Sequence, residues 1–300
     1  MVRPVTVPAP QRNKERLAAL RWALIVSALL VLALLEGWSH FHPAPKPARL
    51  TPSEMATATN APNAPERLAV KVLSVRPHDP AAFTQGLLLE NGSLYESTGQ
   101  YGQSSLREVD PRTGAVKRQV SVPPQYFAEG LTLVGERLIQ LTWQERKALV
   151  YNRADFKPAG EFRYEGDGWG LCWDGVRLVM SDGSDHLTFR DPKTFAVLGT
   201  VKVTVAGQPA YQLNELECVD GPGGKVIYAN VWQTDDILRI DPKDGRVTAV
   251  IDAAGLLTRE ERLKTDVLNG IAWDPATQTF LITGKLWPKM FQVKFVPAPR

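Results

Sequence analysis

The stretch that decides the fold is residues 213–252, LNELECVDGPGGKVIYANVWQTDDILRIDPKDGRVTAVID. It contains four short apolar runs separated by turns rich in Gly, Pro and Asp, and these runs read LNELECV, VIYANVW, ILRI and VTAVI. Short apolar runs bounded by such turns are typical of a four-stranded antiparallel meander. One such sheet cannot bury its own apolar surface, so we expect the unit to recur along the chain.

The unit does recur, and two independent registers agree. Each unit begins with a polar or aromatic residue, which Gly follows in four units and Glu215 in the fourth along the chain. The five starts are Gln85, Glu129, Trp169, Asn214 and Asn269, in steps of 44, 40, 45 and 55 residues. The turn after the third strand reads DPRTG at 110, NRADF at 152, DPKTF at 191 and DPKDG at 241. A period of roughly 20 to 50 residues is typical of propellers and solenoids, and we predict an all-β, five-bladed β-propeller.

The ends of the repeat region indicate how the ring closes. Residues 68–75, LAVKVLSV, form a predicted strand that precedes the first repeat, while the last repeat supplies only three strands before the chain ends. We expect the N-terminal strand to complete the last blade, because this closure removes edges that would otherwise aggregate. The predicted propeller domain is residues 68–297.

The first 41 residues differ from the rest of the chain. Five basic residues precede an apolar run over residues 22–35, in which Ser27 is the one polar residue. Its fourteen residues suit a signal-peptide core, since a membrane span needs roughly 20. No Ala-x-Ala cleavage site directly follows the run, where Glu36-Gly37-Trp38 stand instead. This favours an uncleaved membrane anchor with its basic end cytoplasmic and leaves a cleaved signal peptide as the alternative. Either interpretation predicts a periplasmic or otherwise extracytoplasmic domain.

Residues 42–67 are rich in Ala, Pro, Thr and Asn, and we expect them to form a disordered linker. The net charge of +3 is carried by the N-terminal segment, because residues 1–35 hold five bases and one acid, leaving the remainder at −1. This distribution argues against a nucleic-acid partner. We separately expect the protein to be a monomer. Cys172 and Cys218 lie in the first strands of neighbouring repeats, so a disulfide and two buried thiols both stay open.

In a propeller the first strands line a central channel, so the five repeat starts should meet near the axis. The residues that close the second strands should surround the same mouth, and they are Gly99, Trp143, Gly183, Trp232 and Lys285. The predicted mouth thus gathers one carboxylate, three carboxamides, one Lys and three Trp. Channel-lining amides often only hold water, but three indoles indicate a stacking or cation-binding wall.

Several motifs carry a resemblance to a known family. They read HDPAAFTQGL (78–87), FAEGLT (127–132), EGDGWGL (165–171), SDGS (181–184), LNELE (213–217), ANVWQTDDILRIDP (229–242), VLNGIAWD (267–274) and TGKLWPKMFQV (283–293). Together they resemble the motifs of plant-type glutaminyl-peptide cyclotransferases over about residues 70 to 294. The resemblance implies a five-bladed propeller that converts the N-terminal Gln of peptides or proteins to pyroglutamate and releases ammonia.

The resemblance also implies residue roles. Glu129 falls on the family's proton-transfer Glu, although Ala128 stands where the family usually has Gly. Lys285 is the second expected catalytic residue. The substrate-binding residues that the resemblance implies are Gln85, Trp169, Asn214 and Trp232. We add Trp143 and Asn269 because the repeat register places them at the same mouth.

We expect no cofactor and no catalytic metal. Of four His, His40 and His42 precede the predicted propeller domain, which leaves His78 and His186, too few for a convincing zinc site. A structural calcium in the Asp-rich loop 181–185 stays open. The alternative function is a non-catalytic propeller that binds a peptide or sugar in the cell envelope.

Overall fold

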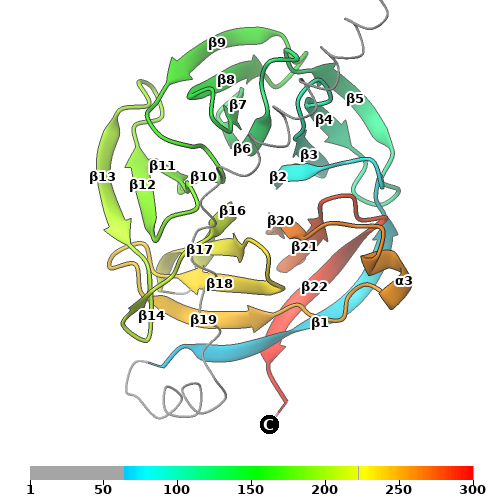
Figure 1. The fold of residues 1–300 in the computed structure, drawn as a ribbon, viewed down its shortest axis with the longest axis vertical. Helices are drawn as coiled ribbons and strands as arrows, with labels where there is room; N and C mark the ends of the chain where they lie inside the picture. The colour runs from blue at the N-terminus through cyan, green and yellow to red at the C-terminus, as the bar shows by residue number, and fades with distance from the viewer. Residues whose placement is uncertain (1–63, 222, 300) are drawn as a thin grey trace, which may run out of the picture. The chain divides into compact units, whose positions relative to one another are not determined.

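The structure is a computed structural model that describes residues 64–299 apart from residue 222. It is almost entirely β, and its large sheets stand around a common axis with the strand that begins each repeat innermost (Figure 1). The arrangement is propeller-like. The predicted N-terminal helix and nearly all of the predicted linker lie outside the described residues.

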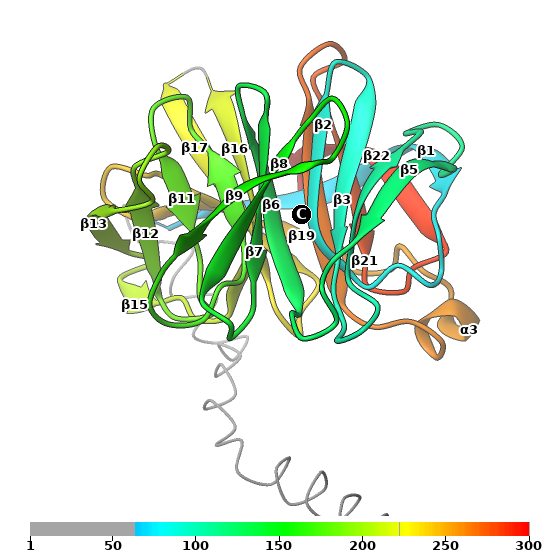
Figure 2. The same ribbon diagram turned by 90° about the horizontal axis from the view of Figure 1, so that it is seen from above.

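Three sheets are simple four-stranded meanders. The first holds β2 (Thr84–Glu90), β3 (Ser93–Thr98), β4 (Ser105–Val109) and β5 (Val116–Ser121). The second holds β6 (Ala128–Val134), β7 (Arg137–Thr142), β8 (Lys147–Asn152) and β9 (Pro158–Arg163). The third holds β10 (Leu171–Trp173), β11 (Leu178–Met180), β12 (His186–Arg190) and β13 (Val197–Lys202). Figure 2 shows these sheets from the side.

The remaining large sheet has eight strands and consists of two antiparallel halves. One half is β16 (Leu213–Gly221), β17 (Gly224–Val231), β18 (Asp236–Ile240) and β19 (Val247–Asp252), which are the four strands predicted from residues 213–252. The other is β20 (Leu268–Asp274), β21 (Thr279–Gly284), β22 (Lys289–Pro297) and β1 (Glu66–Pro77). Short additions are β14 (Thr204–Val205), β15 (Gln208–Pro209) and α3 (Arg259–Arg262).

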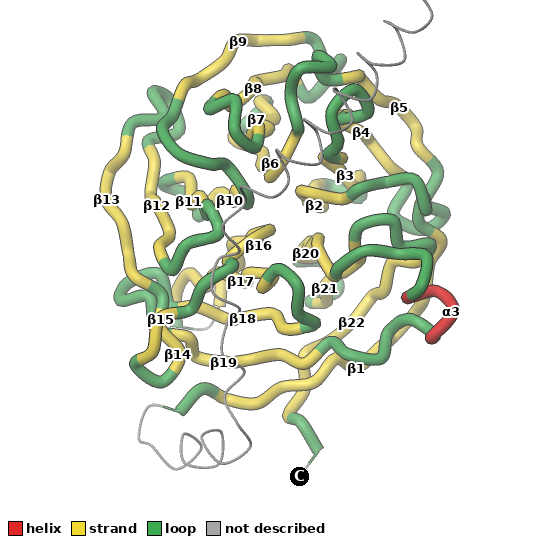
Figure 3. Tube along the Cα trace, viewed as in Figure 1, coloured by secondary structure: helices red, strands yellow, loops and turns green. Residues whose placement is uncertain are grey.

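Strand β1 joins the two ends of the described chain. It pairs antiparallel with β22, from Leu68 opposite Pro297 to Pro77 opposite Lys289 (Figure 3). The predicted pairing of the N-terminal strand with the last repeat is therefore confirmed. The strand also pairs in parallel with β19 at its N-terminal end, which the sequence did not predict and which merges the two halves into one sheet.

The two sequence registers have physical causes. In the turns after β4 and β12, the side chains of Asp110 and Asp191 accept backbone N–H groups two and three residues later, which fixes the reversal. The glycines that follow the first three repeat starts, Gly86, Gly130 and Gly170, allow neighbouring inner strands to approach. A Cβ on Gly86 would lie 2.5 Å from the backbone nitrogen of Leu131, so a larger residue there would separate the first two sheets.

The core lies between neighbouring sheets. One apolar cluster, for example, joins the third sheet to the β16–β19 half and includes Val179, Leu187, Leu213, Ile227 and Ile240, which are fully buried. A disulfide between Cys172 of β10 and Cys218 of β16 connects the same two sheets, with their Cα atoms 5.5 Å apart. The pairing that the sequence left open is therefore formed. No helix in residues 64–221 and 223–299 is long and apolar enough to span a bilayer.

Candidate active site

Three of the five repeat starts form one hydrogen-bonded cluster. Gln85 at the start of β2 donates from Nε2 to Oε1 of Glu129 on β6, over 2.9 Å. Asn269 on β20 donates from Nδ2 to Oε1 of Gln85 over 3.3 Å and to the Thr84 carbonyl over 2.9 Å. Their exposed fractions are 3%, 5% and 0% for Gln85, Glu129 and Asn269, so the cluster is withdrawn from water. The predicted convergence of these three positions is what the structure shows.

The electrostatics of Glu129 are unusual for a carboxyl group. Burial raises the pKa of Glu129 well above its ordinary value, and the positive charge of Lys285 opposes this while Asp167 and Glu145 add to it. Lys285 follows β21 and is itself buried, which lowers its pKa, although Glu129 and Asp266 oppose that shift. Its Nζ lies 4.9 Å from the ring centre of Phe83, within reach of a cation–π contact. A buried carboxyl group whose pKa is raised in this way is suited to accept and return a proton.

Two of the predicted Trp residues contact each other. Trp169, just before β10, and Trp232, just after β17, meet edge to face with ring centres 5.6 Å apart. The Trp169 carbonyl accepts the N–H of Gly130 over 2.7 Å, which places this indole pair beside the strand that carries Glu129. A Cβ on Gly183 would lie 2.8 Å from the Trp169 ring, so glycine leaves space there for the indole.

The third predicted Trp belongs to a different aromatic group. The Trp143 ring packs against Phe127 at 5.7 Å, and Phe127 also contacts Phe83 and Tyr101. The Trp143 indole N–H donates to Asp167 Oδ2 over 3.1 Å. The mouth thus has two aromatic groups, where the sequence predicted one wall.

Four buried amide oxygens have no hydrogen-bond partner among the described residues, and two of them, Oδ1 of Asn214 and Oδ1 of Asn269, belong to repeat starts. Asn214 is 2% exposed, and its backbone carbonyl accepts the Ser181 hydroxyl over 2.7 Å, so β16 is held firmly there. Buried acceptors usually find a donor. These two oxygens are therefore suited to accept N–H groups of a ligand.

Sequence reasoning missed two charged residues near Glu129. Glu145 accepts the Tyr101 hydroxyl over 2.8 Å, and Asp167 accepts the Trp143 indole. Asp167 lies inside the EGDGWGL motif, two residues before Trp169, and this position was the available signal. Glu145 carried no comparable signal, because it follows Trp143 in a loop outside the family-like motifs.

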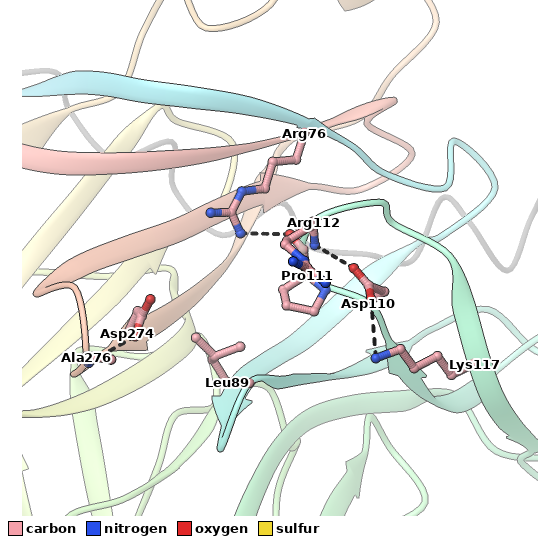
Figure 4. A pocket seen from close by; sticks show the side chains of 9 residues that line it. Arg76, Leu89, Asp110, Pro111, Arg112, Lys117, Asp274 and Ala276 are labelled. Atoms are coloured by element: carbon pink, nitrogen blue, oxygen red, sulfur yellow. Dashed lines mark hydrogen bonds and ion pairs between the residues drawn. The ribbon is translucent and has the colours of Figure 1, made fainter.

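A separate pocket of about 410 Å³ lies away from this cluster (Figure 4). Its lining includes Leu89 and Asp274, from the ends of β2 and β20 opposite to Gln85 and Asn269. Three of its charged side chains, Arg76, Asp110 and Lys117, already have partners. Lys117 pairs with Asp110 at 3.3 Å, and the Arg76 guanidinium donates to the carbonyl of Pro111 and to Gln292.

In the described part of the chain, no group of three or more His, Cys, Asp or Glu side chains is placed to hold a metal ion. In the Asp-rich loop 181–185, Asp182 accepts the backbone N–H and hydroxyl of Ser184. Asp185 pairs with His186 at 2.7 Å and with Lys202 at 3.4 Å.

Comparison with known proteins agrees with this geometry. A family model described as glutamine cyclotransferase matches residues 47–295. The chain belongs to the glutamine cyclotransferase family. It is 44% identical over 234 residues to a glutaminyl-peptide cyclotransferase of Arabidopsis thaliana, covering 76% of this chain and 72% of that protein. The crystal structure of Myxococcus xanthus glutaminyl cyclase matches with a TM-score of 0.70 and 40% identity, covering 78% of this chain and all of that one.

The predicted family and activity class, glutaminyl-peptide cyclotransferase, are thus confirmed. The roles of single residues are a separate question, since the comparisons assign none.

Proposed function

We propose that this cyclotransferase closes the ring of an N-terminal Gln by moving one proton through Glu129. The observation that carries the proposal is the buried Glu129 carboxyl group, held by Gln85 over 2.9 Å in a setting that raises its pKa. The substrates are peptides or proteins that begin with Gln, the class named for the relatives.

The reaction requires two proton transfers. The neutral α-amine attacks the γ-carboxamide carbon, so a C–N bond forms and the amine loses a proton to Glu129. The bond to the amide nitrogen then breaks, and Glu129 returns the proton so that nitrogen leaves as ammonia. One carboxyl group that accepts and returns a proton is sufficient, and we propose that catalysis needs no metal.

We propose that Lys285 stabilises the oxyanion that develops on the attacked carbonyl. Two observations support this role: Lys285 is buried, and its charge interacts with Glu129. In a site withdrawn from water, a fixed positive charge stabilises such an oxyanion more than it would in solvent. Its positive charge also restrains the rise of the Glu129 pKa, which keeps the carboxyl group able to accept a proton.

Binding residues would hold the Gln side chain folded over its own amine. Trp169 and Trp232 are proposed as the wall of the pocket, with Trp143 at its outer edge. Asn214 and Asn269 offer unpartnered amide oxygens to the substrate N–H groups, beside Gln85. Because the reaction is intramolecular, correct folding of the substrate accounts for much of the rate.

We count the eight-stranded sheet as two blades, which gives five, with β1 as the outer strand of the last. The register between β1 and β22 supports this count. A chain that begins at residue 78 lacks β1 and leaves β22 and β19 unpaired at one edge. It should lose most of its resistance to thermal unfolding, and an unchanged unfolding temperature would refute closure by β1.

We further propose a monomeric domain over residues 68–297 outside the cytoplasm, tethered by residues 42–67 to a membrane anchor within residues 1–41. The apolar run at 22–35 and the composition of the tether support this arrangement. Fractionation of cells that express the whole chain tests it. A soluble cytoplasmic product would contradict the proposal.

Incubation of the purified protein with a Gln-initiated peptide tests the function. Ammonia and the pyroglutamyl peptide should appear in equal amounts, and should still appear after dialysis against a strong chelator. A peptide that begins with Asn is the matched control, because its shorter side chain places the carboxamide carbon out of reach for five-membered ring closure. Binding of the Gln peptide without ammonia release would support the non-catalytic alternative, and zinc-reversible loss of activity would refute metal independence.

A further inference from the structure

We propose that Asn269 is a positioning residue that fixes Gln85 as the hydrogen-bond donor to Glu129, and so reserves Glu129 Oε2 for proton exchange. The inference rests on the proposed role of Glu129. It assigns Asn269 a task beyond contact with the substrate.

The direction of the hydrogen bonds is set by a backbone carbonyl. The oxygen of Thr84 can only accept, so the Asn269 amide must present its nitrogen, which donates over 2.9 Å. The second hydrogen of that nitrogen faces Gln85 Oε1 at 3.3 Å. Gln85 must then present Nε2 to Glu129, over 2.9 Å. The side-chain amides of Asn269 and Gln85 therefore each have one orientation. Reversing either amide would place two hydrogen-bond acceptors against each other.

This order distinguishes the two oxygens of Glu129. Oε1 accepts from Gln85, whereas Oε2 has no hydrogen-bond partner in residues 64–221 and 223–299. A proton on Oε1 would face the N–H group of Gln85, so the proton is held on Oε2. The three side chains are almost completely buried, so water does not compete for these bonds.

Charged and titratable groups around Glu129 come from several loops. Those that interact with it electrostatically are Lys285 after β21, Asp167 before β10, Glu145 between β7 and β8, Tyr101 between β3 and β4, and Tyr164 after β9. None of them contacts Asn269 through a hydrogen bond within the described residues, so a change at Asn269 acts on Glu129 through Gln85.

The test is the pH dependence of kcat/KM for ammonia release by Asn269→Asp. An ionised Asp accepts from Gln85 Nε2 and turns the amide, so that Gln85 Oε1 faces Glu129 and favours its protonated form. The acidic limb of the profile should move to higher pH by about one unit. At a given pH on that limb, kcat/KM should therefore fall roughly tenfold. KM should change less than about threefold, because the affected interaction is made in the transition state.

Asn230→Asp is the matched control. Asn230 on the neighbouring strand β17 is fully buried, and its Oδ1 accepts the N–H of Gly270 over 2.9 Å, an interaction that an Asp retains. This variant introduces the same charge without contact to Gln85. A shift of the limb as large as that of Asn269→Asp would show that charge alone acts, and the proposal would fail.

A second comparison needs no buried charge. Asn269→Leu should lower kcat roughly tenfold in the native protein but leave kcat nearly unchanged when Gln85→Leu is already present. Loss of the substrate contact through Asn269 Oδ1 should raise KM in both backgrounds. Equal losses of kcat in both backgrounds would overturn the proposal. The two failures are distinguishable: a native protein that releases no ammonia refutes the proposed function, whereas an active protein with additive variants refutes only the role of Asn269.

Discussion

Glu129 and Glu215 are both buried carboxyl groups on innermost strands, but their partners differ in kind. Glu129 is held through one oxygen by the side chain of Gln85. Glu215 uses both oxygens, accepting the backbone N–H of Leu87 on β2 over 3.3 Å and that of Ile271 on β20 over 2.8 Å. It therefore connects three inner strands across the axis.

The comparison shows that burial alone does not make a catalytic acid. Burial raises the pKa of both groups well above the ordinary range, reinforced at Glu215 by the neighbouring Glu217. Of the two, only Glu129 has an oxygen without a partner among the described residues and a nearby Lys. We infer that Glu215 holds the ring together, while Glu129 is left able to exchange a proton.

The largest expected effect on stability comes from Glu215→Leu. The change leaves two buried backbone N–H groups without acceptors, and each unpaired group costs about 1–3 kcal/mol. The free energy of unfolding should therefore fall by about 2–6 kcal/mol. Urea unfolding measures this, with Glu215→Gln as a milder variant that keeps one acceptor oxygen. Glu129→Leu removes no backbone partner and should cost less. A larger loss at Glu129 would reverse the comparison.

A smaller effect should follow loss of the disulfide, which fixes β16, the strand that carries Glu215, to β10. Cys172→Ala with Cys218→Ala should lower stability by about 2–4 kcal/mol. Guanidinium unfolding with and without a reductant checks this, since reductant should affect only the native protein. Equal unfolding midpoints for native and variant proteins would show that the bond contributes nothing to the ring.

The smallest effect is the pH dependence of stability. The pKa of Glu215 is raised in the folded protein. Its contribution to folding stability is therefore present below the unfolded-state pKa of about 4.3 and is lost as pH rises toward the folded-state pKa. A tenfold difference between the folded and unfolded dissociation constants of the carboxyl group corresponds to about 1.4 kcal/mol. Unfolding from about pH 4.5 to about pH 8 should therefore show the native protein losing stability relative to Glu215→Gln. A gain relative to that variant would contradict the raised pKa.

Glu96 is an internal control for the direction in which a buried carboxyl group changes stability with pH. Burial opposes its ionisation, but His78, at 2.9 Å, and Arg107 outweigh burial and hold its pKa below the ordinary value. Its contribution is present above the unfolded pKa and is lost as pH falls through the folded one. Glu96→Gln should therefore change the acid side of the stability profile, and Glu215→Gln the neutral side.

Local patterns were enough to predict much of the fold and some of the site. The repeat starts indicated which residues reach the axis, and three of them, Gln85, Glu129 and Asn269, do form one cluster. The Asp-Pro turns and the pairing of the N-terminal strand also followed from sequence, because each depends on short-range chemistry or on strand number.

Features that depend on how neighbouring sheets stack were not predictable. The 5.5 Å between the Cα atoms of Cys172 and Cys218 is set by the spacing of two sheets. The position of Trp143 beside Phe127 depends on loop packing. Glu215 gave no warning of its role either, since its two acceptor contacts reach strands 128 and 56 residues away in sequence.

The central claim is that Glu129, and not Glu215, transfers the proton. The most direct measurement is single-turnover ammonia release by Glu129→Gln and Glu215→Gln under conditions where both are folded. Glu129→Gln should be slower than the native protein by roughly 10²- to 10⁴-fold, with peptide binding nearly unchanged, while Glu215→Gln should stay within about tenfold. A Glu129→Gln protein that releases ammonia at the native rate would contradict the account.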